Sequence, residues 1–128
     1  MTREPIPEEL RRFVLTSIPS VPFVEALLVF RGAGGETVDT PLIARRLYLG
    51  EKAAAEVVAQ LAEAGMVRPA GDAVPGHRYD PDPALGAMIE LLVQFYRTHL
   101  VEVTDLIHSK TGRKAQQFAD AFKWKKEN

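Results

Sequence analysis

The chain has 128 residues, of which 46% are apolar and 26% charged, and a formal net charge of -1. This length suits one domain that buries its own core, and the composition is that of an ordinary soluble globular protein. The absence of cysteine excludes disulfides and thiolate metal sites, and a charge near zero provides no overall attraction to phosphate.

The sequence gives no sign of export or membrane insertion. The amino-terminal run MTREPIPEELRRF contains acids and prolines and has no apolar signal core. No uninterrupted apolar run approaches the roughly 20 residues that cross a bilayer. We therefore expect a cytoplasmic protein without a membrane partner.

The first third of the chain predicts two helices. Residues 7–9 (PEE) favour a helix start, and Pro19 ends that helix. Ser20 is a plausible N-cap for a second helix, VPFVEALLVFR, which is apolar on nearly every side. A helix with so little polar surface is usually buried at the centre of a domain. The glycine-rich residues 32–35 end it.

Two more helices are predicted after a short extended run at residues 36–39. Thr40 or Asp39 caps the first of them, and proline follows in its first turn. A break at Leu49-Gly50 separates it from an amphipathic helix over residues 51–64, whose inner face is Ala54, Val57, Val58 and Leu61.

A β-hairpin is predicted next. Gly65 is the expected left-handed residue at the helix end. Residues 66–68 and 77–79 read as short strands on either side of a loose tip at residues 69–76. The extended run at residues 36–39 is a candidate partner for these strands.

The longest predicted element is a helix from Pro83 to about Ser109, about 37 Å long at 1.5 Å per residue. One apolar stripe follows it at spacings of four and three residues: Ile89, Val93, Tyr96, Leu100, Val103 and Ile107. Two interpretations remain open. The stripe packs on the first helix and Phe13 within one chain, or it pairs with a second copy. Further apolar residues lie beside the stripe, which favours a homodimer as well as a core contact.

The end of the chain is basic. Residues 110–128 contain six basic and two acidic residues and carry +4, while residues 1–109 carry -5. After a break at Thr111-Gly112, residues 115–125 predict a last short amphipathic piece. Any electrostatic attraction to nucleic acid therefore lies mainly in this tail.

Residues 43–47 (IARRL) and 61–67 (LAEAGMV) resemble the winged-helix superfamily of bacterial transcription regulators, above all its MarR-like and ArsR-like members. In those families an LA..L helix precedes a helix ending in L...GLV, and a wing follows. The resemblance covers residues 21–81, about half of the chain. With the order of elements it predicts one mainly α domain with a small β-hairpin. Residues 1–20 hold an N-terminal helix, 21–81 a winged helix-turn-helix, and 82–128 a long C-terminal helix with a short basic tail.

The resemblance implies that the start of the second helix of the pair faces DNA. Specific base readout usually needs Arg, Lys, Asn or Gln there, and among residues 51–56 Lys52 alone qualifies. The candidate DNA contacts are Arg45, Arg46, Lys52, Arg68, His77 and Arg78. The competing interpretation is that these side chains are solvated surface charges.

No catalytic or metal-binding pattern is visible in the sequence. The three histidines (His77, His99 and His108) are scattered, without the spacing of a metal motif. Residues 108–114 contain Gly-Arg-Lys but lack the glycine-rich sequence of a phosphate loop. We therefore expect a protein that is not an enzyme and has no metal or other cofactor.

Two functions follow as hypotheses. The leading one is a non-enzymatic transcriptional regulator that binds duplex DNA as a homodimer. The alternative is a winged-helix module that docks a protein partner and does not touch DNA. In that case the small side chains of Ala53, Ala55 and Ala59 would allow close approach of the partner.

Overall fold

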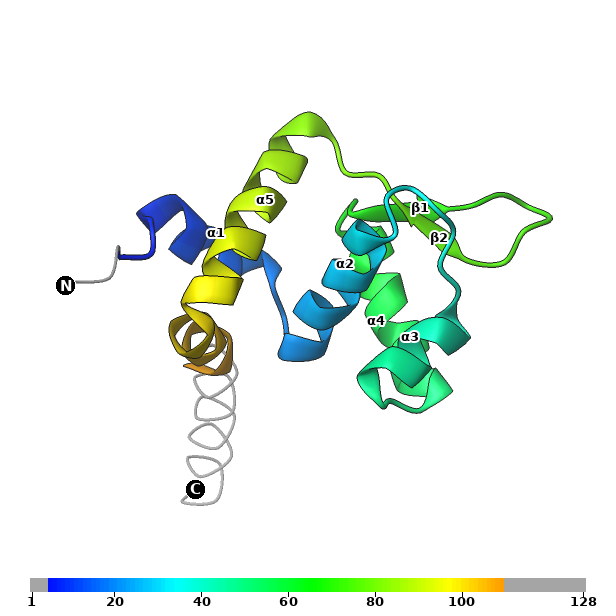
Figure 1. Cartoon of the computed structure of the whole chain (residues 1–128), viewed down its shortest axis with the longest axis horizontal. Coiled ribbons are helices and arrows are strands. Elements are labelled where there is room, and N and C mark those ends of the chain that lie inside the picture. The colour runs from blue at the N-terminus through cyan, green and yellow to red at the C-terminus, as the bar shows by residue number, and fades with distance from the viewer. Residues whose placement is uncertain (1–4, 110–128) are drawn as a thin grey trace, which may run out of the picture.

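The computed structural model describes residues 5–109 as a set of helices with one small hairpin (Figure 1). Along the chain these are α1 (Glu8–Ser17), α2 (Val21–Gly32), α3 (Thr40–Leu47), α4 (Glu51–Glu63), β1 (Val67–Pro69), β2 (His77–Tyr79) and α5 (Pro83–Thr98). Residues 100–109 are also helical. The predicted mainly α chain with a small hairpin is confirmed, whereas the piece predicted at residues 115–125 lies outside the described residues.

Three helices begin at a side-chain cap that the local sequence supplies. The side chains of Ser20, Asp39 and Asp82 accept a hydrogen bond from the backbone N–H three residues on, at 3.3, 3.0 and 2.8 Å. Each of these helices has a proline in its first turn. Such caps satisfy N–H groups that the helix itself leaves unpaired. The cap predicted at Ser20 is confirmed, and of the two caps predicted for α3 the structure has Asp39 and not Thr40.

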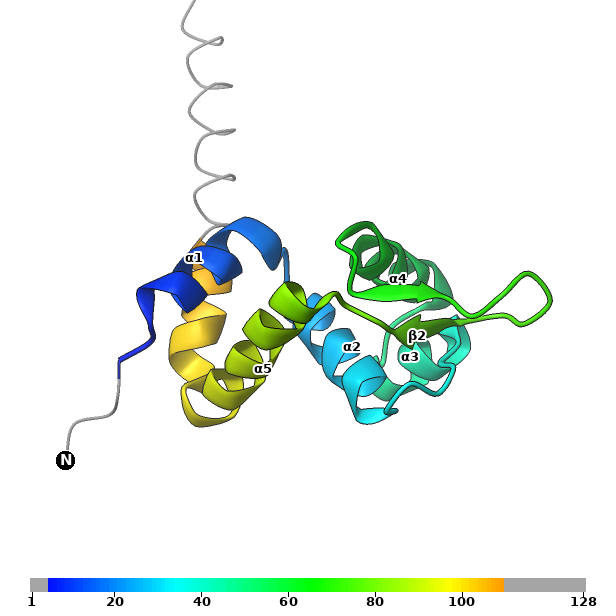
Figure 2. The same cartoon turned by 90° about the horizontal axis from the view of Figure 1, so that it is seen from above.

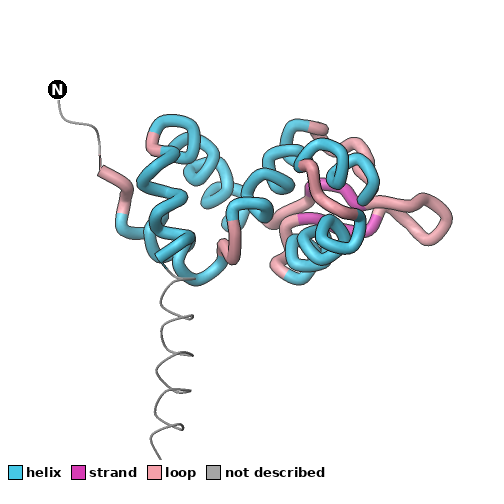
Figure 3. The backbone as a smooth tube through the Cα atoms, turned by 90° about the horizontal axis from the view of Figure 1, so that it is seen from below, coloured by secondary structure: helices cyan, strands magenta, loops and turns pink. Residues whose placement is uncertain are grey.

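The hairpin pairs antiparallel and receives a third short extended segment (Figure 3). Val67 lies opposite Tyr79 in the hairpin. Val38 pairs with His77 through two backbone hydrogen bonds of 2.8 and 2.9 Å. The predicted pairing of residues 36–39 with the hairpin is therefore confirmed, and it ties the segment before α3 to β2.

α2 lies at the centre of the fold, because it packs on α3, on α4 and on the hairpin strand β2. Its buried side chains are Phe23, Val24, Ala26, Leu27 and Phe30. The inner face predicted for α4 is confirmed, since Ala54, Val57, Val58 and Leu61 are all buried. Gly65 follows α4 with a φ of +79°, the left-handed conformation expected there.

The elements form two groups, seen side by side in Figure 2. α1 packs on α5, while α2, α3, α4 and the hairpin pack on one another. Two polar contacts from α2 to α5 join the groups. Arg31 donates two hydrogen bonds of 2.6 Å to the carboxylate of Glu90, and the Tyr96 hydroxyl donates one of 2.7 Å to Glu25.

The prediction of one long helix over residues 83–109 is wrong. α5 ends at Thr98, His99 has a non-helical φ of -129° and ψ of 45°, and a second helical stretch covers residues 100–109. The His99 side chain is 7% exposed, and its ring centroid lies 4.9 Å from that of Phe95. A straight rod of about 37 Å would overrun α1, whose ten residues span about 15 Å. The bend lets both stretches bury apolar side chains in one core.

The apolar stripe therefore serves the core of a single chain. Ile89, Val93, Tyr96, Val103 and Ile107 are all buried, and Leu100 is 50% exposed. This burial matches the interpretation that the stripe packs within one chain. The six residues do not form a continuous surface for a second copy in this conformation, so the predicted dimerisation stripe is corrected, while the homodimer itself stays a prediction.

Within residues 5–109, no single helix combines the length and the apolar content that a membrane crossing requires.

Candidate functional site

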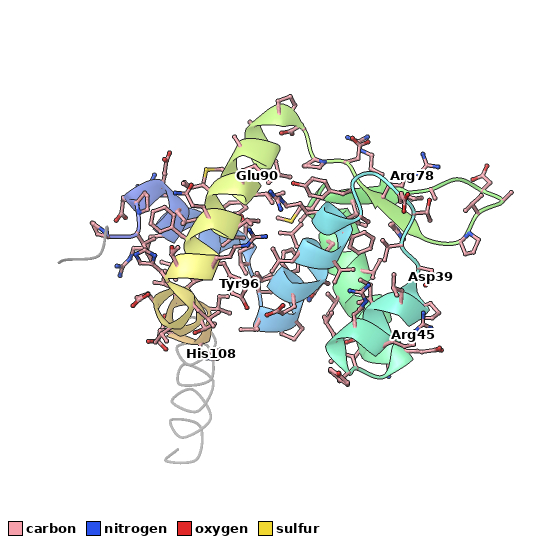
Figure 4. All side chains as sticks on the ribbon, in the orientation of Figure 1. Asp39, Arg45, Arg78, Glu90, Tyr96 and His108 are labelled. Carbon is pink, nitrogen blue, oxygen red and sulfur yellow. The ribbon has the colours of Figure 1, made fainter. Side chains whose placement is uncertain are left out.

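The sequence points to the exposed surface of α3, α4 and the hairpin, which we call the helix–hairpin face. The six candidate DNA contacts belong to these three elements. Five of them are exposed and His77 is partly buried: Arg45, Arg46, Lys52, Arg68, His77 and Arg78. Figure 4 shows Arg45 on α3 and Arg78 on the hairpin side of the molecule. Within the described part of the chain, no hydrogen bond or ion pair joins any two of the six.

Arg45 and Arg46 do not act as one patch, because successive residues of an α-helix point about 100° apart. Arg46 lines a groove between α2 and α3, where two adjoining cavities of about 410 and 500 Å³ share Arg46, Glu25 and Val29. Arg45 lines neither cavity and is exposed. Of the two, Arg45 is thus the side chain available on the helix–hairpin face, while Arg46 lines the groove that Glu25 also lines.

The exposed side of α4 is acidic and rich in alanine. Lys52 is the sole basic residue of this helix, and it lies between exposed Glu51 and Glu56. Ala53, Ala55 and Ala59 are also exposed. Gln60 adds one more donor near the end of the helix. This side offers few groups for reading base edges, and its acids repel phosphate.

The candidate residues on the hairpin, Arg68, His77 and Arg78, make contacts within the hairpin or with the segment before α3. Arg68 Nε lies 3.2 Å from an Asp80 carboxylate oxygen, in an exposed ion pair of the kind that contributes little stability. Arg78 Nε donates to the Thr37 hydroxyl at 3.2 Å. Since a guanidinium has five N–H donors, Arg78 keeps several for a ligand. His77 is engaged through its backbone with Val38.

Sequence reasoning missed Tyr48, in the turn between α3 and α4. The break was predicted at Leu49-Gly50, but α3 already ends at Leu47 and its C-cap Tyr48 is left-handed, with φ 56° and ψ 42°, and Gly50 is the N-cap of α4. Tyr48 is 95% exposed. A non-glycine residue in this region is uncommon, and an exposed aromatic ring there is a candidate contact. The signal available in the sequence was an aromatic residue within a turn.

Perturbed pKa values occur at the junction of α2 and α5 and at the hairpin. The hydrogen bond from Arg31 lowers the pKa of Glu90 and raises that of Arg31 itself. Burial, with help from Glu25, raises the pKa of Tyr96, and burial raises the pKa of Tyr79. Among residues 5–109 no three His, Asp or Glu side chains gather in a way that could hold a metal ion. The Arg31–Glu90 and Tyr96–Glu25 hydrogen bonds link α2 to α5.

Comparison with protein-family models, curated proteins and solved structures finds no match to this chain. The resemblance to winged-helix regulators thus stays a prediction from the sequence pattern. Function has to be argued from the geometry of the helix–hairpin face.

Proposed function

We propose that residues 21–81 form a winged helix-turn-helix and that the protein is a non-enzymatic regulator that binds duplex DNA. The order of α2, an extended segment at Val38, α3, α4 and the hairpin supports this proposal. In that layout the second helix of the pair enters the major groove, and neighbouring elements contact the backbone.

One observation carries the DNA proposal. Exposed cations lie on α4 and on two elements beside it. Lys52 is on α4, Arg45 is on α3, which packs on α4, and Arg78 is on β2 of the hairpin, whose other strand β1 packs on α4. Cations that flank a groove-binding helix contact phosphates, and phosphate contacts position a protein without reading sequence. Since α4 offers few base-reading groups, we propose binding through the DNA backbone with low sequence specificity.

We further propose that the protein acts as a homodimer, which would double the number of phosphate contacts. The remaining exposed apolar residues near the bend after α5 are Leu100 and Val101, 50% and 64% exposed. They are adjacent, and they replace the buried stripe as candidates for the surface between copies. Sedimentation that shows one chain of 14.2 kDa at micromolar concentration would contradict the dimer.

Fluorescence anisotropy with a labelled duplex tests the DNA proposal. Raising salt from about 50 to about 200 mM should weaken binding steeply, because phosphate contacts release counterions. Arg45→Ala with Arg46→Ala should abolish retention, and each single variant will show which arginine matters; we expect Arg45. Arg11→Ala with Arg12→Ala is the matched control, an exposed arginine pair on α1. Wild-type protein that does not bind the duplex at low salt would rule the proposal out.

A second candidate function is docking of a protein partner on α4. The exposed alanines Ala53, Ala55 and Ala59, with acids in place of base-reading groups, favour it. Replacing Glu51 and Glu56 with Lys separates the two functions. DNA binding should become tighter in this variant, since two repulsive charges become attractive ones. A protein contact through the acidic face would weaken instead.

A further inference from the structure

A cleft of about 360 Å³ lies where α1, α2, α4 and α5 meet, away from the helix–hairpin face candidates. Figure 2 shows α1 and α4 on either side of the start of α5. The apolar lining includes Phe13, Phe23, Met66 and Leu85. The polar lining comes from the last turns of two helices: Thr16 and Ser17 from α1, and Gln60 and Glu63 from α4.

The described lining of the cleft carries a formal negative charge. Its described lining contains the Glu63 carboxylate and no Lys, Arg or His. The carbonyl groups at a helix C-terminus carry partial negative charge, which a basic residue in the last turn usually offsets. α2, α3 and α5 each have an arginine there, but α1 and α4 have no basic residue in the last turn. Two helix ends that have no basic residue in their last turn therefore meet at one cleft beside a carboxylate.

The apolar side chains that line the cleft favour a ligand with an apolar part. Phe23 and Met66 are 1% exposed, and Phe13 is partly buried beside them. Aromatic faces attract cations as well as apolar groups. The volume falls at the small end of the range for small-molecule sites. A fitting ligand thus combines a compact apolar body with a positive charge.

We propose that this cleft binds a small organic ammonium ion with an aromatic or short aliphatic body. The ammonium group donates to the Glu63 carboxylate and lies near the C-terminal carbonyls of α1 and α4. The apolar body packs on Phe13 and Leu85. Glu63 is exposed and makes no hydrogen bond or ion pair with another described residue, so it can accept these bonds. The proposal does not depend on DNA binding.

Calorimetric titration of the full chain with 2-phenylethylammonium chloride at neutral pH tests it. 2-Phenylethanol and phenylacetate serve as neutral and anionic probes of similar size. We expect one ammonium bound per chain, more tightly than the alcohol, with phenylacetate weakest. Absence of binding by the ammonium, or equal affinity for the alcohol, overturns the proposal.

Two substitutions locate the site. Glu63→Gln should weaken ammonium binding at least about tenfold, the size expected for losing a charge-assisted hydrogen bond. Glu51→Gln is the matched control, because Glu51 is an exposed acid at the other end of α4, and it should bind like wild type. Equal affinity in the two variants overturns the assignment of Glu63.

Gln60→Lys introduces a cation into the cleft and should abolish ammonium binding. Gln60 is exposed, so the substitution should leave the fold intact, which circular dichroism checks on the same sample. A folded Gln60→Lys protein that binds the ammonium as wild type does would overturn the proposed position of the charge.

Discussion

The α2–α4 and hairpin region differs from the α1–α5 region in how local sequence defines its elements. In the first region a capping side chain, a glycine or a left-handed residue marks most helix ends, and the elements follow the sequence prediction closely. In the second region an unbroken apolar stripe predicts one rod, but the chain bends at His99. Caps and glycines act on neighbouring residues, whereas the bend accompanies the burial of side chains on both sides of His99. Apolar periodicity thus predicts which side chains are buried better than it predicts where a helix ends.

The largest effect on stability should come from substitutions in the apolar stripe, which contains both a fully buried and a half-exposed residue. Ile107→Ala should lower the free energy of unfolding by about 2–5 kcal/mol, because a fully buried side chain leaves a cavity. Leu100→Ala, in the same predicted stripe but half exposed, should cost less than about 1 kcal/mol in a monomer. Urea unfolding measures both. Equal losses would mean that the stripe is buried along its whole length, as a dimer through it requires.

The next largest effect on stability should come from Gly76, because the hairpin lies close to the segment before α3 at this residue. A Cβ at Gly76 would lie 2.7 Å from the Thr37 methyl carbon and 2.8 Å from the Val38 carbonyl oxygen, at a φ of +114°. Gly76→Ala should therefore destabilise by about 1–3 kcal/mol. Gly35→Ala is the control, since Gly35 also has positive φ but open space around its Cβ position. Thermal unfolding should show a clearly larger loss for Gly76; a smaller one would argue against the close pairing of Val38 with His77.

A substitution in the turn between α3 and α4 should raise, not lower, the free energy of unfolding. Tyr48 is left-handed and 95% exposed, so Tyr48→Gly removes backbone strain without removing burial. The free energy of unfolding should stay level or rise by up to about 1 kcal/mol. Chemical denaturation checks this, and a loss above about 1 kcal/mol would show that the ring makes a stabilising contact. If Tyr48 contacts DNA, the same variant should bind the duplex less tightly while folding at least as well.

The smallest effect belongs to the contact that joins the two regions. Arg31 lowers the pKa of Glu90 below its ordinary value of 4.5. The ion pair therefore stabilises the fold fully above that value, and its contribution is lost as the pH falls through the lowered pKa. The Glu90 side chain is 54% exposed, so the contribution should stay below about 1 kcal/mol.

Glu90→Gln tests this contribution. The variant should be slightly less stable than wild type at about pH 7, and the difference should shrink at about pH 3. Unfolding in urea at both pH values measures it. A difference that grows towards low pH would reverse the sign and exclude the Arg31 contact as its cause.

The candidate site could be predicted from the sequence in its residue types and exposure, but not in its contacts. The sequence pattern identified Lys52 and its acidic neighbours as exposed, and α4 presents them so. It could not show that Arg46 turns to the α2 groove, or that Arg68 pairs with Asp80 across the hairpin. Those contacts depend on which elements pack together, and residue types alone do not specify that.

The amino-acid sequence alone was enough to predict the helix caps at Ser20 and Asp39 and the left-handed glycine after α4. Ser20 and Asp39 act on N–H groups three residues away, and Gly65 adopts a conformation that its lack of a side chain permits. Tertiary structure alone decided the bend at His99, the burial of the stripe within one chain and the Arg31–Glu90 contact across 59 residues. The physical reason is range: a cap is satisfied by its nearest neighbours in the chain, whereas burial is a property of surfaces that meet after folding.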